Sequence, residues 1–254
     1  MILLEAKKLH KIYNTKNGKG GVHAVNDIDI TIENGDFVAI MGSSGSGKTT
    51  LLNVLSGIDN FTSGNLRISD KDISLMTANE LALFRRQNLG FVFQEFNLLD
   101  SLTIEENIML PMILDQKDIN EIEQKVNTTV KMFDIEDIVN KYPYEVSGGQ
   151  QQRAAICRAI INDPEIIFAD EPTGNLDSNA SEKVMKCFQQ LNEMKQIAII
   201  MVTHDAFVAS YCSKVIFIKD GQINNEIRKV NGKTEFFHNI LDCLSQIGGN
   251  IDDK

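Results

Sequence analysis

Eight consecutive residues, Gly42 to Thr49, fit the pattern G-x-x-x-x-G-K-[ST] and have the chemistry of a phosphate-binding loop. Glycines let the backbone curl so that its N–H groups point at a phosphate, Lys48 can neutralise phosphate oxygens, and the Thr49 hydroxyl can bind Mg²⁺. The loop lies between a strand-like run, Phe37 to Met41, and a helix-like run, Thr50 to Leu55. The predicted nucleotide contacts in this segment are Gly42, Ser43, Ser44, Gly45, Ser46, Gly47, Lys48, Thr49 and Thr50.

Two carboxylates follow another apolar run directly. Ile166 to Ala169 is succeeded by Asp170 and Glu171, and a buried strand would deliver these acids to the sheet edge beside the phosphate loop. We expect Asp170 to hold Mg²⁺ through water and Glu171 to polarise an attacking water. Alone, such a pair also fits a solvated turn, but together with the loop it favours hydrolysis of a nucleoside triphosphate.

A second candidate anion site lies about a hundred residues after the loop. Ser147, Gly148, Gly149 and Gln150 precede a helix-like segment, Gln151 to Ile161. Their backbone donors would lie at a helix N-terminus, where N–H groups and the helix dipole favour negative charge. The chain is therefore predicted to bind phosphate in two different ways.

The elements that must position these residues alternate between strand-like and helical patterns, which predicts an α/β fold with a mostly parallel core sheet. Ahead of the phosphate loop, Leu3 to Leu9 and Val25 to Ile32 alternate like half-exposed antiparallel strands, joined by a mobile loop at Asn14 to Gly21. The predicted core strands are Phe37 to Met41, Ile166 to Ala169, Ile197 to Val202 and Val215 to Lys219.

Helical patterns fill the middle and the end of the chain. Capping-box pairs are predicted at Thr77 with Glu80 and at Thr103 with Glu106, and Pro111 predicts a kink or break in a helical region from about Leu98 to Ala155. The expected apolar helix faces are Ile119, Ile122, Val126, Val130 and Phe133, and Val184, Phe188, Leu191 and Met194.

A last amphipathic helix is predicted after Glu235, closed by Gly248 and Gly249. Its apolar face could pack on the chain's own core or bind a partner, and the sequence leaves both alternatives open. The face consists of Phe236, Phe237, Ile240, Leu241, Leu244 and Ile247.

Composition narrows the classes of function. With 43% hydrophobic and 24% charged residues, the 254-residue chain has the composition of a globular protein, and no apolar run approaches the length of a membrane span. The net charge of −10 argues against general nucleic-acid binding. The four cysteines form no C-x-x-C or Cys/His cluster, so a reducing cytoplasm is expected. Any work at a membrane would go through a partner.

The order of these motifs resembles the nucleotide-binding subunit of an ATP-binding cassette (ABC) transporter, over essentially the whole chain. Val146 stands where that family usually has leucine, an apolar exchange that should keep the site intact. The resemblance implies a cassette at 1–228 with a helical subdomain inserted at about 95–160, and an extension at 229–254. It also implies adenine stacking on Tyr13, sensing of Mg²⁺ and γ-phosphate by Gln94, a dimer-interface loop ending at Asp177, and a switch role for His204.

The resemblance further implies a mechanism that needs two cassettes arranged head to tail. ATP on one phosphate loop would be covered by the Ser147 to Gln150 segment of the other subunit, and hydrolysis would reopen the dimer. Lys48, Glu171 and His204 would be catalytic, while Thr49, Gln94 and Asp170 would hold Mg²⁺. Gln94 would couple the γ-phosphate to residues 95–102, which would meet an integral membrane permease.

Finer features resemble the macrolide-exporter and lipoprotein-releasing branch, and most of all its bacitracin-resistance type. They are Phe93 to Leu99, Ala169 to Asp177, Leu52 to Asp59, Ser210 to Cys212 and Val215 to Gly221, with the Phe-Phe tail helix. The implied role is an ATPase at the cytoplasmic face of the membrane, powering a permease for resistance to or sensing of antimicrobial peptides, with a sensor histidine kinase as a further partner. Macrolide export, lipoprotein release and envelope remodelling are alternatives. A regulatory ABC protein without a permease is disfavoured, because the chain has one cassette and no zinc cluster.

Overall fold

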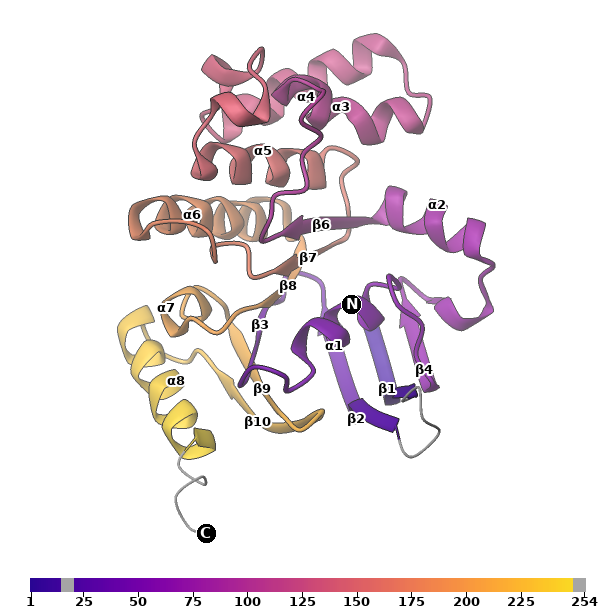
Figure 1. Ribbon diagram of the computed structural model, residues 1–254, viewed down its shortest axis with the longest axis vertical. Coiled ribbons are helices and arrows are strands. Elements are labelled where there is room, and N and C mark those ends of the chain that lie inside the picture. The colour runs from indigo at the N-terminus through magenta and orange to yellow at the C-terminus, as the bar shows by residue number, and fades with distance from the viewer. Residues whose placement is uncertain (15–20, 249–254) are drawn as a thin grey trace.

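A computed structural model describes residues 1–14 and 21–248. The predicted loop at Asn14 to Gly21 therefore lies largely outside the described residues, as does Gly249. Two sheets flank a central helix, and further helices form an upper layer (Figure 1). The helices are α1 (Lys48–Leu55), α2 (Ala78–Asn88), α3 (Ile104–Leu114), α4 (Ile119–Met132), α5 (Gly148–Ile160), α6 (Ser178–Lys195), α7 (Ala206–Ala209) and α8 (Lys233–Gly248), with 3₁₀ turns at Ile73–Leu75, Glu136–Ile138 and Pro143–Glu145.

The core sheet is mostly parallel, as predicted, and has six strands in the order β10-β9-β3-β8-β7-β6. Only β10 runs antiparallel to its neighbour. Four strands match the predicted apolar runs to within one residue at each end. The strands are β3 (Phe37–Met41), β6 (Leu89–Phe93), β7 (Ile166–Asp170), β8 (Ala198–Val202), β9 (Lys214–Lys219) and β10 (Gln222–Arg228).

The N-terminal sheet is antiparallel, also as predicted, and its strand order is β2-β1-β4-β5. It is larger than the two strands expected from the sequence, because two short strands after α1 join it. Its strands are β1 (Ile2–Asn14), β2 (Gly21–Glu33), β4 (Ser63–Ile68) and β5 (Lys71–Asp72).

Side chains on the core sheet alternate between two separate apolar clusters. On β3, Val38 and Ile40 face a cluster that includes α1 and the N-terminal sheet, while Ala39 and Met41 face a cluster built with the helical layer and the tail. Because both faces are covered there, the central strands β3, β7 and β8 are almost wholly apolar. Their carboxyl ends converge at one edge of the sheet, where the loops that carry the candidate site begin.

The helical layer confirms most of the predicted helix signals. Both capping boxes form: the Thr77 and Thr103 hydroxyls accept from the amides of Glu80 and Glu106. Of the predicted kink or break at Pro111, the break does not occur, because α3 continues through Pro111 to Leu114. Burial of Ile108 and Met112 on either side of Pro111 stabilises the helix across the missing N–H.

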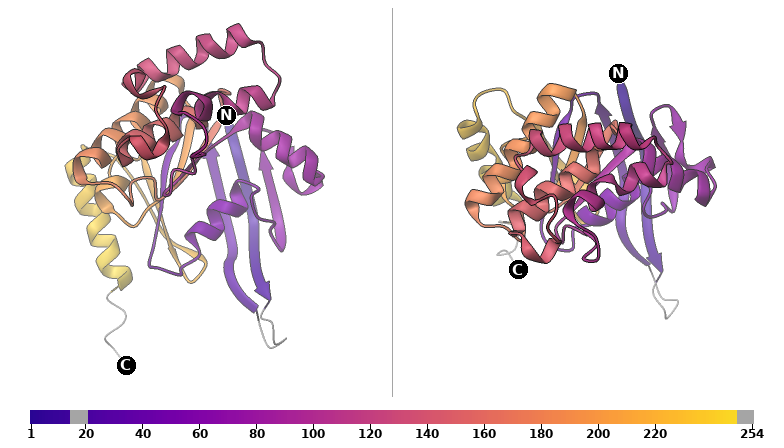
Figure 2. Two further views of the ribbon diagram at one scale, coloured as in Figure 1. Left: turned by 45° about the horizontal axis from the view of Figure 1, so that its top comes forward. Right: turned by 90° about the horizontal axis from the view of Figure 1, so that it is seen from above.

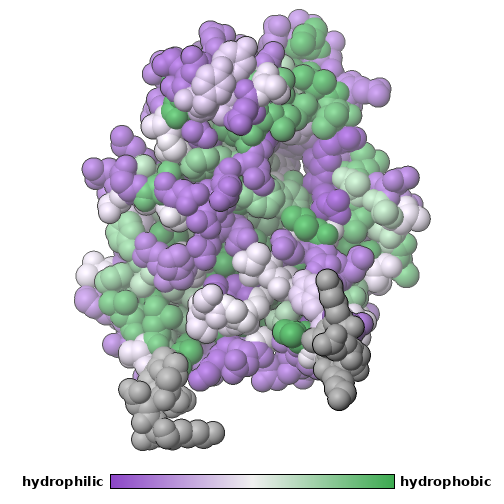
Figure 3. Space-filling view, viewed as in Figure 1, coloured by the Kyte–Doolittle hydropathy of each residue, from purple (hydrophilic) through white to green (hydrophobic). Residues whose placement is uncertain are grey.

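Two residues expected on apolar core faces are exposed instead. Ile119 is the first residue of α4 and Met194 lies in the last turn of α6, so both extend past the surface that their helices cover. Ile113 and Leu114 are also exposed beside Ile119, and Figure 3 shows apolar residues gathered around this end of α3 and α4. The remaining predicted face residues of α4 and α6 are buried.

The tail helix packs on the chain's own core, which is the first of the two alternatives. Phe236 and Ile240 are buried in the same cluster as the helical layer, whereas Leu241 is exposed. Lys233 lies 3.2 Å above the Tyr211 ring and holds the start of α8 against α7. Figure 2 places α8 on the opposite side of the molecule from the N-terminal sheet. Among the described helices, none combines the length and the apolar character needed to cross a bilayer.

Candidate active site

The phosphate loop lies between β3 and α1 and packs tightly against other backbone. A Cβ atom added to Gly42 would lie 2.2 Å from the Ile218 oxygen, and one on Gly47 would lie 2.0 Å from the Ala24 oxygen. Gly47 also has a φ of +99°, a left-handed conformation that favours glycine. The loop therefore needs glycine at both positions, because β9 and β2 leave no room for a side chain.

Ser46 provides an independent sign that the loop binds a polar ligand. Its side chain is buried, and its hydroxyl has no hydrogen-bond partner among the described residues. A buried hydroxyl without a partner is costly unless something else satisfies it. Since the neighbouring loop residues are those of a phosphate cradle, a phosphate oxygen fits this requirement.

Lys48 occupies a buried position at the start of α1. Its ammonium group donates to the Ser43 carbonyl at 2.8 Å. The residue as a whole is only 8% exposed. Burial lowers the Lys48 pKa, whereas the nearby carboxylates of Glu171 and Asp170 oppose that change. A phosphate group would supply further negative charge to this cation and stabilise its charged form.

Thr49 and Asp170 bring an oxygen pair together across the sheet edge. The Thr49 hydroxyl donates to Asp170 Oδ1 at 3.3 Å. Burial raises the Asp170 pKa, and the Glu171 charge raises it further, while the Thr49 hydrogen bond and Lys48 act in the opposite direction. A hydroxyl and a desolvated carboxylate are oxygen donors of the kind that Mg²⁺ prefers, so these residues fit the metal.

Gln94, the third predicted metal ligand, has a different partner in this structure. Its amide nitrogen donates to Asn175 Oδ1 at 3.1 Å, and the Asn175 amide donates back to the Gln94 carbonyl at 3.1 Å. Gly174 allows this approach, since a Cβ there would lie 3.0 Å from the Gln94 amide. Gln94 thus connects two loops at the site, and its metal contact stays a prediction.

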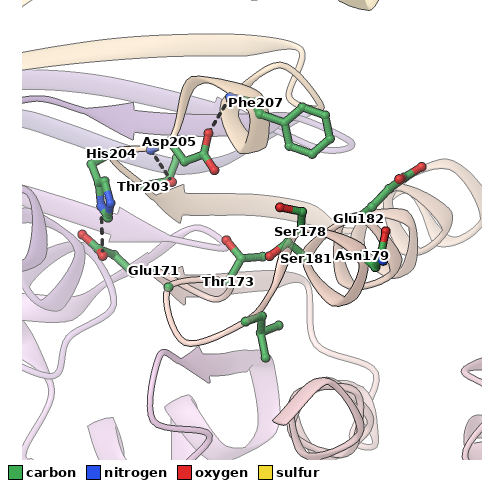
Figure 4. A pocket seen from close by; sticks show the side chains of 12 residues that line it. Glu171, Thr173, Ser178, Asn179, Ser181, Glu182, Thr203, His204, Asp205 and Phe207 are labelled. Atoms are coloured by element: carbon green, nitrogen blue, oxygen red, sulfur yellow. Dashed lines mark hydrogen bonds and ion pairs between the residues drawn. The ribbon is translucent and has the colours of Figure 1, made fainter. Parts of the chain in front are cut away.

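Glu171 and His204 face each other at the ends of neighbouring strands. His204 Nδ1 lies 3.1 Å from Glu171 Oε2, as Figure 4 shows. Glu171 has a φ of +44°, and its amide donates to the Val202 carbonyl at 2.9 Å, which fixes the turn after β7. Both side chains border a cavity of about 520 Å³. The carboxylate is therefore held by a histidine at the rim of an open space, where it can polarise a water molecule.

Tyr13 lies near the end of β1, and the side chain of Thr50, which follows the phosphate loop, is one of its neighbours. Its ring is 43% exposed, and its hydroxyl donates to Asp59 Oδ2 at 2.6 Å. That hydrogen bond is the main reason why the Tyr13 pKa is raised. The Lys11 ammonium lies 4.7 Å from the ring centre. A half-exposed, fixed ring can stack on a base, and this role stays a prediction.

The second predicted anion site is well formed, but it lies apart from the phosphate loop. Ser147 caps α5, with its hydroxyl accepting from the Gln150 amide, and the Gln150 side chain accepts from the Ser147 amide at 2.9 Å. Ser147, Gly149, Gln150 and Asp177 all border one cavity of about 540 Å³, and no phosphate-loop residue borders it. The sequence-predicted residues thus form two groups within one chain.

Three polar residues connect these parts: Asn175, which belongs to the predicted dimer-interface loop, and Gln152 and Arg158, which sequence reasoning missed. Asn175 pairs with Gln94, and buried Gln152 donates to backbone carbonyls beside the site. Arg158 donates to the Phe96 carbonyl at 2.9 Å. One signal was available for Gln152. It precedes Ala155 by three positions and Ile156 by four, so it shares the apolar face of the predicted helix with them, where a polar residue is unusual.

The model of one protein family, described as ABC transporter, matches residues 25–174, and several curated relatives align over nearly the whole chain. The ATP-binding protein YxdL of Bacillus subtilis (strain 168) is 49% identical over 99% of this chain and 96% of its own. The bacitracin export ATP-binding protein BceA of Halalkalibacterium halodurans is 48% identical over 98% of both chains. The macrolide export protein MacB of Mannheimia succiniciproducens is 42% identical over 90% of this chain but 35% of its own.

Solved structures agree with this relationship. A dimeric ATP-binding cassette in a post-hydrolysis state, bound to ADP and Pi, has a TM-score of 0.81 and 38% identity, and covers 89% of this chain and 98% of that one. The cassettes of this family are ATPases that bind ATP with Mg²⁺ and couple its hydrolysis to transport, which agrees with the phosphate loop and the carboxylates described above. The chain therefore belongs to the ABC transporter family, as one of its ATP-hydrolysing subunits.

Proposed function

We propose that this chain is the ATPase of a permease complex that gives resistance to antimicrobial peptides such as bacitracin, or senses them. The observation that carries the proposal is the end-to-end match with the bacitracin export protein BceA, which covers 98% of this chain and so includes α8. The match with the macrolide exporter MacB covers 90% of the chain. Macrolide export, lipoprotein release or envelope remodelling is the second candidate, supported by that match.

The arrangement of the site supports a dimeric mechanism. The phosphate loop with Asp170 and Glu171 forms one half of a site, and the Ser147 segment with Asp177 forms the other half on a separate cavity. Two copies arranged head to tail would join unlike halves and exclude water from ATP. The dimeric cassette with 38% identity offers a precedent.

Within that closed site, each residue has a definite task. Lys48 would bind the phosphates as a buried cation, and Glu171, oriented by His204, would hold and polarise the attacking water. Thr49 and Asp170 would hold Mg²⁺, which when bound neutralises the charge that develops on the phosphate oxygens. After hydrolysis, the loss of γ-phosphate contacts would let the two chains separate.

We place the chain at the cytoplasmic face of the membrane, held there by an integral membrane permease rather than by a span of its own. The absence of a spanning helix from the described residues and the relatives' names support this position. In this proposal the permease could in turn inform a sensor histidine kinase. Residues 95–102, next to Gln94, are our candidate contact with the permease.

The experiment is a deletion of the gene in its native host, followed by complementation with the wild-type chain or with the Glu171→Gln variant. We expect the deletion strain to become more sensitive to bacitracin, and only the wild-type gene to restore resistance. Sensitivity to a macrolide, measured in parallel, should stay unchanged. Increased sensitivity to the macrolide alone would instead establish the second candidate.

A further inference from the structure

Gln152 is a fully buried side chain in the second turn of α5, and it links three parts of the ATPase site. Its amide nitrogen donates to the Pro172 carbonyl at 2.6 Å and to the Phe93 carbonyl at 3.3 Å. Pro172 follows Glu171 directly, and Phe93 directly precedes Gln94. One side chain from the helix that begins after Ser147 therefore contacts the backbone beside both functional residues.

The two segments held by Gln152 leave the sheet side by side. Strands β6 and β7 are parallel neighbours with Phe93 opposite Asp170, so both chains turn away from the sheet at the same level. The reciprocal hydrogen bonds between Gln94 and Asn175 join these segments to each other. Gln152 lies in α5, so its two hydrogen bonds attach α5 to both of these segments.

Stability alone gives a poor explanation for glutamine at this position. Gln152 Oε1 is buried and has no hydrogen-bond partner among the described residues. A buried acceptor without a partner lowers the stability of the folded state, and this offsets part of what the two donated bonds contribute. In Gln152 the amide nitrogen has partners and the amide oxygen has none. The presence of glutamine is therefore more readily explained by the two backbone segments that its nitrogen holds in place.

We propose that Gln152 is a positioning residue for ATP hydrolysis: through the Phe93 and Pro172 carbonyls it fixes the segments that carry Gln94 and Glu171 relative to the start of α5. Any displacement of the Ser147 end of α5 then reaches both segments through one rigid amide. Gln152 itself touches neither nucleotide nor water in this role. The inference rests on the ATPase activity and is independent of what the permease transports.

The test compares Gln152→Leu with Asn192→Leu in the purified full-length chain. Asn192 is a matched control, because its amide also donates to two backbone carbonyls, those of Gly35 and Ile197 at 2.8 and 3.0 Å, at the opposite edge of the sheet. Both variants lose two donated bonds, and both are assayed below their own unfolding temperatures. For Gln152→Leu we expect kcat to fall about fivefold or more while the KM for ATP stays within about twofold, because Lys48 and the phosphate loop are unchanged.

For Asn192→Leu we expect lower thermal stability but an unchanged kcat and KM. Equal effects of the two variants on kcat, measured at equal folded fractions, would overturn the proposal, since a purely structural role predicts that equality. A higher KM for ATP with an unchanged kcat in Gln152→Leu would also overturn the proposal. Direct ATP binding, measured by titration, separates these outcomes from a damaged phosphate loop.

A second variant, Gln152→Glu, tests the donor itself. A carboxylic acid can donate to Pro172 only when it is protonated, and an ionised carboxylate would face the two carbonyl oxygens without a proton to share. Burial raises the pKa of such a carboxyl. We expect the ratio of variant to wild-type kcat to fall as the pH rises, and the same ratio for Gln152→Leu to stay flat. A ratio for Gln152→Glu that does not change with pH would show that the donor is not required.

Discussion

At the residue scale, the site places a buried lysine near two carboxylates. Lys48 is buried between the phosphate loop and two carboxylates, and burial raises the Asp170 pKa while it lowers that of Lys48. In both groups the first cause of the shift is burial, which disfavours the charged form. The sequence predicted these residues because their chemistry fixes their types, whereas Gln152 acts through backbone carbonyls and leaves no comparable pattern.

We predict that Glu171→Gln keeps ATP binding but slows hydrolysis about 100-fold or more, because an amide cannot accept a proton from water. The variant should also accumulate an ATP-dependent dimer, detected by size-exclusion chromatography with light scattering. Glu123→Gln, a change of an exposed glutamate on α4, is the control and should hydrolyse ATP like the wild type. Hydrolysis by Glu171→Gln at the wild-type rate would remove Glu171 from its assigned role.

At the scale of elements, the sequence identified those whose own periodicity and caps are strong. The buried strands of the core sheet and the capped helices α2 and α3 belong to this class. Strands β4 and β5 were missed because they are short and are specified by pairing: β4 pairs with β1, about sixty residues away in the chain, and β5 pairs with β4. Pro111 does not break α3, since packing on the core overrides the local preference of proline.

The capping box at the start of α2 makes a pH-dependent contribution to stability. The Glu80 carboxylate accepts from the Thr77 amide at 2.8 Å, and this hydrogen bond lowers the Glu80 pKa. A lowered carboxyl pKa stabilises the fold above the unfolded-state pKa, and this stabilisation is lost as the pH falls through the folded-state pKa. Glu80→Ala should therefore lower the free energy of unfolding at pH 7, with a difference from wild type that shrinks in acid.

Urea unfolding followed by circular dichroism at several pH values measures this difference. Glu123→Ala, a change of an exposed glutamate in the middle of α4, is the control and should show no comparable pH dependence. A Glu80→Ala difference that is constant down to pH 3 would mean that the Thr77 hydrogen bond contributes nothing to stability.

At the scale of the whole molecule, the core sheet separates two apolar clusters, and α8 contributes side chains to one of them. Residues of α8 pack with the helical layer, so the last described helix is part of the cassette's core and not an appendage. The sequence could not decide between core packing and partner binding for α8, because amphipathicity alone does not identify the surface that it covers. Three of the four cysteines lie inside these clusters.

Thiol labelling should report on this packing. We expect only Cys243 to react quickly in the folded protein, since Cys157, Cys187 and Cys212 are buried and burial raises the Cys187 pKa to about 11. The Cys243 pKa is also raised, mainly by burial, so its labelling rate should keep rising from pH 8 to more alkaline pH. Cys243→Ser should abolish the fast phase. A second fast thiol in the native state would contradict the described packing.

The order of the core strands has a consequence for how the site can vary. Strand β8 lies between β3, which leads into the phosphate loop, and β7, which carries Asp170 and Glu171. Neighbouring strands are about 4.8 Å apart, so β8 sets a separation of roughly two such spacings between the strand that leads into the phosphate loop and the strand that carries the carboxylates. Its residues Ile200 and Val202 are completely buried. Because backbone hydrogen bonds set this spacing, the reach between Lys48 and the carboxylates depends on the order of the strands, and so on a strand that does no chemistry itself.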